Sequence, residues 1–86
     1  MARLTRVEIE TALARLGELA LLRQTFIELI VMGGAAMVLA HNARESTQDV
    51  DTLIVRPQVA RLVREIAMQV SAEQHLAEDW LNDGAR

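Results

Sequence analysis

The chain has 86 residues, a formal net charge of −3 at pH 7 and a hydrophobic content of 51%. A chain of this length forms one domain with a small core, so we take residues 1–86 as a single domain. All nine basic residues are arginine, against twelve acidic residues, and there is no cysteine; this composition excludes the basic footprint of a dedicated DNA-binding protein and any disulfide framework.

The first expected element is a helix from about Arg6 to Leu22, followed by a connector at residues 23–25. Thr5 and Glu8 have the spacing of a capping box. Apolar residues then recur along one helical face: Ile9, Ala12, Leu13, Leu16, Leu19 and Ala20. A glycine inside the helix, Gly17, weakens it by up to about 1 kcal/mol relative to alanine, which is tolerable where tight packing requires a glycine. We expect this helix to cover one face of a sheet.

Two short apolar runs, residues 27–32 and 50–55, predict buried strands. The first run ends at Gly33-Gly34. Residues 35–41 then favour a helix, and residues 42–48 form a polar loop. The glycine turn and the start of the second strand can meet only if the two strands are antiparallel neighbours.

A second long helix is expected after Pro57, which suits a first helical turn. Its apolar stripe ends near Val70. Residues 71–74 fit another capping box, and we expect a short final helix docked by Leu76, Trp80 and Leu81. The predicted fold is therefore α/β (α+β), in the order α-β-α-β-α plus a short C-terminal helix, with a short antiparallel or mixed sheet covered by helices.

Asp49 and Asp51 form a candidate metal site at the entrance to the second strand. Residues two apart on a strand share a face, about 6.5–7 Å apart. Two carboxylates that close repel unless a proton or a cation lies between them, and carboxylates completed by water and substrate phosphates suit Mg²⁺ (or Mn²⁺). Gly33-Gly34 lets the backbone approach a ligand closely, and the following helix start attracts phosphate. The combination indicates phosphoryl or nucleotidyl transfer.

The ordered motif resembles the nucleotidyltransferase superfamily of the DNA polymerase β type. It is most similar to small bacterial members related to abortive-infection and toxin–antitoxin nucleotidyltransferases. The matching residues are Gly33, Gly34, Ala36, Arg44, Ser46, Thr47, Asp49, Val50 and Asp51. The resemblance covers residues 26–70. It implies that Gly33, Gly34, Arg44 and Thr47 bind the nucleoside triphosphate, and that Asp49 and Asp51 are catalytic and bind the metal.

One departure concerns the third carboxylate that this family usually carries on a strand after the next helix. Only sixteen residues come after Val70, and they show no strand pattern. The nearby acidic candidates are Glu78, Asp79 and Asp83. We therefore expect a reduced or truncated member of the family, although residues 79–82 resemble the segment after this helix in some relatives.

Three functions are compatible with these residues. The first is a Mg²⁺-dependent nucleotidyltransferase that moves a nucleoside monophosphate from an NTP to a protein, RNA or small-molecule acceptor. The second is a non-catalytic, antitoxin-like or partner-binding module of the same fold that lacks the third carboxylate. The third is nucleotide or metal binding without transfer.

Several of these residues also have a purely structural interpretation. Arg44 is equally compatible with an exposed loop position, and His41 with a helix C-terminus. Ser46 and Thr47 can shape the loop through local hydrogen bonds. Trp80 is better interpreted as a core residue than as a platform for stacking bases.

The longest apolar run, residues 29–40, is too short to span a bilayer, so we expect a cytoplasmic protein without membrane association. Two apolar strands are too few for an independent sheet and would leave unprotected edges. We therefore expect a homodimer or a partner protein that covers them.

Overall fold

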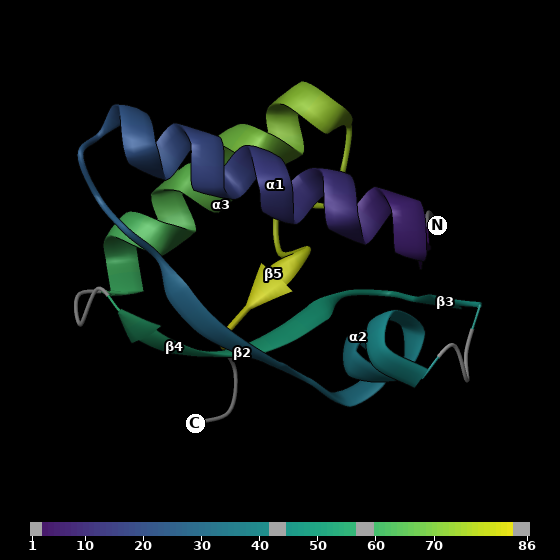
Figure 1. Cartoon of the computed structure of the whole chain (residues 1–86). Helices are drawn as coiled ribbons and strands as arrows, with labels where there is room; N and C mark the ends of the chain where they lie inside the picture. Colours follow the sequence, from purple (N-terminus) through teal and green to yellow (C-terminus); the bar gives the residue numbers. More distant parts are fainter. Residues whose placement is uncertain (1–2, 42–44, 57–59, 84–86) are drawn as a thin grey trace.

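The computed structural model describes residues 3–41, 45–56 and 60–83. In it, helices α1 and α3 lie together over one side of a three-stranded sheet, and the short helix α2 lies at one end of that sheet (Figure 1). The elements in chain order are β1 Leu4–Thr5, α1 Arg6–Leu22, β2 Glu28–Met32, α2 Gly33–Ala36, the π-helix η1 Met37–His41, β3 Ser46–Thr47, β4 Val50–Arg56, α3 Ala60–Gln74 and β5 Leu81–Asn82.

Helix α1 begins with the predicted capping box. The backbone N–H of Glu8 donates to Thr5 Oγ1 (3.4 Å), and the backbone N–H of Thr5 donates to Glu8 Oε1 (2.9 Å). Both bonds satisfy amide groups that a helix start otherwise leaves without a partner. The helix extends to Leu22, as the apolar periodicity predicts, and the connector begins at Arg23.

The larger sheet has the strand order β2-β4-β5. Strands β2 and β4 are antiparallel, as predicted, with Met32 opposite Asp51 and Ile30 opposite Leu53. Side chains of β4 alternate between the two faces: Val50 and Thr52 are fully buried, whereas Asp51 and Leu53 are exposed. The buried face packs against the helices, and the other face carries the acidic residue.

The expected short C-terminal helix is wrong, because this segment contributes a third strand instead. Residue His75 adopts a left-handed conformation (φ 59°) directly after α3. Strand β5 then pairs in parallel with β4, with Leu81 opposite Val50 and Asn82 opposite Asp51. Residues 71–74, which fit a capping box, lie inside α3.

Trp80 explains why the chain returns to the sheet. Its side chain is fully buried, and its indole N–H donates to the carbonyl of Ala67 in α3 (2.9 Å). Its own carbonyl accepts from the backbone N–H of Val50 (2.6 Å). Burying the indole with its N–H satisfied fixes the tail against both α3 and β4. Trp80 is thus a core residue, as expected from the sequence.

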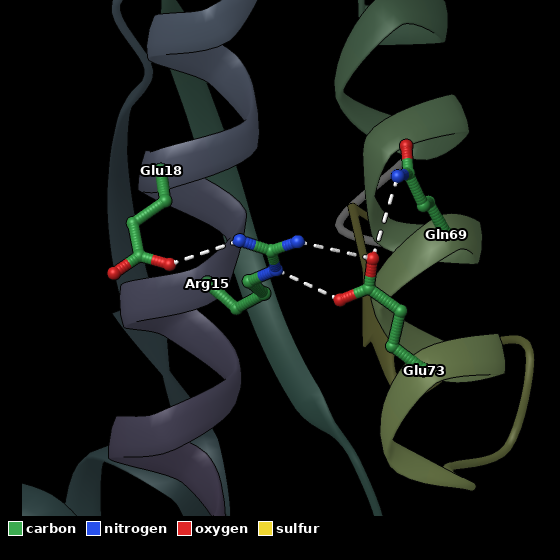
Figure 2. A network of polar contacts seen from close by, with 4 residues as sticks. All are labelled: Arg15, Glu18, Gln69 and Glu73. Carbon is green, nitrogen blue, oxygen red and sulfur yellow. Dashed lines mark hydrogen bonds and ion pairs between the residues drawn. The ribbon is translucent and has the colours of Figure 1, made fainter.

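The two long helices are joined on their exposed side by Arg15 of α1 and Glu73 of α3 (Figure 2). The Arg15 guanidinium donates to both carboxylate oxygens of Glu73, at 2.8 and 3.2 Å. Arg15 also contacts Glu18, and Gln69 donates to Glu73.

None of the described helices combines the length and the apolar character needed to cross a bilayer.

A second, two-stranded sheet was not anticipated. It pairs β1 with β3, so that Leu4 lies opposite Thr47 and Thr5 opposite Ser46. The side chain of Arg3 supports the pairing by donating to Ser46 Oγ (2.8 Å) and to its carbonyl (3.1 Å). This sheet ties the end of the polar loop to the start of α1.

Candidate functional site

The two candidate metal ligands lie where the chain enters β4. Asp49 directly precedes the strand and is half-buried, and Asp51 is exposed on the face opposite the helices. Val50, between them, is fully buried in the core. The core therefore fixes the backbone between the two carboxylates, while both remain outside it.

The glycine turn lies directly against Asp51. Gly33 follows Met32, which is paired with Asp51 across β2 and β4. Gly33 has a φ of +64°, and a β-carbon there would lie 3.3 Å from Asp51 Oδ2. Only glycine adopts this conformation without strain, and its lack of a side chain leaves the space beside the carboxylate open. Gly34, the next residue of α2, is half-buried.

A third polar side chain, Asn82 of β5, completes the arrangement. Its amide Nδ2 donates to Asp49 Oδ2 at 3.0 Å, and its backbone lies opposite Asp51 in the parallel ladder. The sequence interpretation missed Asn82 because a two-residue strand has no periodicity to detect. The signal that could have found it was the apolar pair Trp80-Leu81 directly before it.

The pKa of Asp49 is raised above its ordinary value. Burial is the main cause, and the negative charges of Asp51 and Asp79 add to it, whereas the hydrogen bond from Asn82 acts in the opposite direction. A carboxylate in this position is stabilised in its charged form by a nearby cation. The raised pKa therefore reflects a partly buried carboxylate with further negative charge close to it.

Two further residues, Arg44 and Thr47, were predicted to bind the nucleotide. Arg44 lies outside the described residues. The side chain of Thr47 is buried, and its hydroxyl donates to the backbone carbonyl of Asp49 (3.2 Å). Thr47 thus shapes the loop that presents Asp49.

The donor set suits a hard divalent cation with an incomplete protein shell. Within residues 3–41, 45–56 and 60–83, no group of three acidic, histidine or cysteine side chains is placed to hold a metal. Two carboxylates, Asp49 and Asp51, match the one or two that Mg²⁺ commonly takes from protein, the other positions being filled by water and substrate phosphates.

The three acidic candidates for a third ligand lie near β5 but differ in what they contact. Asp79 acts on Asp49 through its charge. Asp83 instead accepts from Arg64 (2.8 Å), and Glu78 is exposed. The strand on which the family resemblance places a third carboxylate does exist, and its residue opposite Asp51 is the amide Asn82.

An open cleft of about 290 Å³ adjoins this region. It runs between α3 and the tail, and the residues lining it are Arg64, Ala67, Met68, Glu78, Asp79, Leu81, Asn82 and Asp83. A second cleft, of about 320 Å³, lies between α1 and β2 and is lined mainly by apolar side chains, with Glu28 as its charged residue. The first cleft is lined by Asn82 and Asp79, the two residues of the tail that act on Asp49.

Residues 3–83 match the model of a known protein family. The matching family, DUF6036, is described as a nucleotidyltransferase of unknown function. Comparisons with curated proteins and with solved structures gave no match.

Proposed function

Since the chain belongs to this nucleotidyltransferase family, we propose that it is a Mg²⁺-dependent enzyme that transfers a nucleoside monophosphate from an NTP to an acceptor hydroxyl. The observation that carries the proposal is the contact between the glycine turn and the acid pair: a β-carbon at Gly33 would lie 3.3 Å from Asp51 Oδ2. A phosphate-binding turn directly beside a metal-binding carboxylate can act on the same triphosphate.

In the proposed reaction the acceptor oxygen forms a bond to the α-phosphorus, the bond to the β-phosphate oxygen breaks, and pyrophosphate leaves. The acceptor proton passes to solvent. Gly33-Gly34 holds the triphosphate, and Asp49 and Asp51 hold Mg²⁺ or Mn²⁺. The ion, when bound, neutralises charge on the phosphate oxygens, and such transfers depend chiefly on positioning and electrostatic stabilisation.

The finer assignments come from the resemblance of the motifs. We assign Arg44 to the nucleotide phosphates and Thr47 to the loop that carries Asp49, the latter supported by its hydrogen bond to the Asp49 carbonyl. The acceptor is a protein, an RNA or a small molecule. The resemblance of the motifs to abortive-infection and toxin–antitoxin nucleotidyltransferases supports a function in such a system. In that function the chain would associate with a second copy of itself or with a partner protein.

The direct test incubates the protein with each labelled NTP, Mg²⁺ and cell extract. We expect label transfer by the wild type and none by Asp49→Ala/Asp51→Ala. Glu28→Gln is the matched control, because Glu28 is an acidic residue at the other end of the sheet, paired with Arg56 (3.1 Å). Absence of transfer by the wild type, together with stable capture of one protein from the extract, would favour the non-catalytic module.

A binding measurement complements the transfer assay. Mg²⁺ with NTP should raise the melting temperature of the wild type and of Glu28→Gln, because a ligand that binds only the folded state stabilises it. Asp51→Asn should abolish the rise. An equal rise in Asp51→Asn would mean that the nucleotide binds elsewhere.

A further inference from the structure

We propose that Asn82 is a positioning residue of the acid pair, whose side-chain amide holds the Asp49 carboxylate in the orientation that receives the divalent cation. This inference rests on the proposed function, since it assigns a role to Asn82 within the same site.

The backbone of Asn82 is fixed independently of its side chain. Strand β5 pairs with β4 so that Asn82 lies opposite Asp51. The Asn82 carbonyl accepts a hydrogen bond from the buried hydroxyl of Thr52 (3.0 Å). Leu81 and Trp80, directly before it, are buried. A side chain on this support presents its amide to Asp49 from a constant position.

The contact itself joins Asn82 Nδ2 to Asp49 Oδ2 at 3.0 Å. Asp49 is surrounded by like charge from Asp51 and Asp79, so without a partner its carboxylate would turn away from them. An amide N–H satisfies one carboxylate oxygen without bringing a positive charge that would compete with the cation. We assign the other oxygen, Oδ1, to the cation.

Asn82 and Asp83 are neighbours in the sequence but contact different partners, and the position of the amide before the carboxylate decides which of them meets Asp49. An ionised carboxylate at position 82 could not donate to Asp49 and would add a third negative charge beside it. The neighbouring Asp83 accepts instead from Arg64 of α3 (2.8 Å). An amide thus meets the acid pair while the carboxylate next to it meets an arginine.

The decisive measurement is Mn²⁺ affinity, from the electron paramagnetic resonance signal of free Mn²⁺. We expect Asn82→Ala to bind Mn²⁺ about 10- to 100-fold more weakly than the wild type, the usual cost of losing a group that orients a metal ligand. Asp83→Asn, which alters the adjacent side chain, should bind like the wild type. Equal affinity of Asn82→Ala and wild type would overturn the inference.

A second measurement needs no metal and separates this inference from the proposed function. The exchange variant Asn82→Asp/Asp83→Asn differs from Asp83→Asn only at position 82, where a carboxylate replaces the amide. In EDTA it should melt below Asp83→Asn, because it places a carboxylate against Asp49. Equal melting temperatures would overturn the role of Asn82. If the wild type does not bind Mn²⁺, the metal site of the proposed function fails, and the comparison in EDTA still decides whether Asn82 positions Asp49.

Discussion

Two glycines of this chain differ in whether the structure requires a glycine at their position. Gly33 adopts a φ of +64°, and a β-carbon there would approach Asp51 Oδ2 to 3.3 Å. Gly17 lies within α1, and apart from the adjacent backbone of that helix a β-carbon there would meet no atom of the described residues within 4 Å. The tight packing that would justify Gly17 is therefore absent, whereas Gly33 is required by both backbone and space.

Alanine substitutions at the two glycines should accordingly change stability in opposite directions. Gly17→Ala should raise the free energy of unfolding by about 0.5–1 kcal/mol, because alanine loses less backbone entropy in a helix. Gly33→Ala should lower it by about 1–2 kcal/mol, the cost of a left-handed conformation for an L-residue. Urea unfolding measures both, and losses of similar size in the two variants would contradict the structure.

At the scale of elements, the exposed contact between α1 and α3 depends on the ionisation of Glu73. The hydrogen bonds from Arg15 are the main cause that lowers the pKa of Glu73 below its ordinary value. A carboxylate with a lowered folded-state pKa stabilises the fold above its unfolded pKa and loses that contribution as the pH falls through the folded value.

Glu73→Gln should therefore be less stable than the wild type at pH 7, and the difference should vanish at acid pH. The difference in the free energy of unfolding between the two proteins should have its full size above about pH 4.3, the ordinary glutamate pKa. It should shrink as the pH falls below that value. Unfolding by urea at a series of pH values measures it. Glu10→Gln is the control, since Glu10 pairs with Arg6 inside the same helix, α1. A pH-independent loss in Glu73→Gln would refute the assignment.

The tail strand β5 depends on a single large side chain. Trp80→Ala should lower the free energy of unfolding by about 3–5 kcal/mol, because it removes a fully buried aromatic group. Trp80→Phe should cost about 1–2 kcal/mol, mainly from the lost hydrogen bond to Ala67. Circular dichroism is the appropriate probe, since Trp80 is the only tryptophan. Near-wild-type stability of Trp80→Ala would mean that the tail does not support the sheet.

At the scale of the whole molecule, the sheet leaves apolar surface on the face opposite the helices. Ile30 and Leu53, opposite each other on β2 and β4, are 51% and 50% exposed. Val55 lies further along β4 and is also exposed. Strand β5 pairs with the start of β4, so the expectation of a two-stranded sheet is wrong. Among the strands that the structure describes, β2 lies at the edge of this sheet. Exposed apolar faces and edges of this kind favour association.

We therefore predict that the protein forms a homodimer, or binds a partner, through β2 and the exposed sheet face. Light scattering at micromolar concentration should show a dimer in the pure protein, and Leu53→Glu should dissociate it. Met68→Glu is the matched control, because Met68 is equally exposed (50%) but lies on α3. A monomer at high micromolar concentration would refute self-association, and dissociation by Met68→Glu alone would place the interface on α3.

Local sequence signals determined the elements that make the framework of this protein. The capping box and apolar spacing set α1 at Arg6–Leu22, and two apolar runs around Gly33-Gly34 predicted the antiparallel pair β2 and β4. The same stretch drew attention to Asp49 and Asp51, because a glycine turn and alternating aspartates are close together in sequence. Each of these signals is a pattern of residue types and their spacing along the chain, which can be recognised without knowing the tertiary structure.

Tertiary structure alone decided how the tail and the loop return to this framework. Strand β5 exists because Trp80 is buried against α3 and bonds to Val50, thirty residues earlier in the chain. The pairing of β1 with β3 likewise joins residues more than forty positions apart. Two-residue strands have no periodicity, so only long-range burial and hydrogen bonding could bring Asn82 to the carboxylate of Asp49.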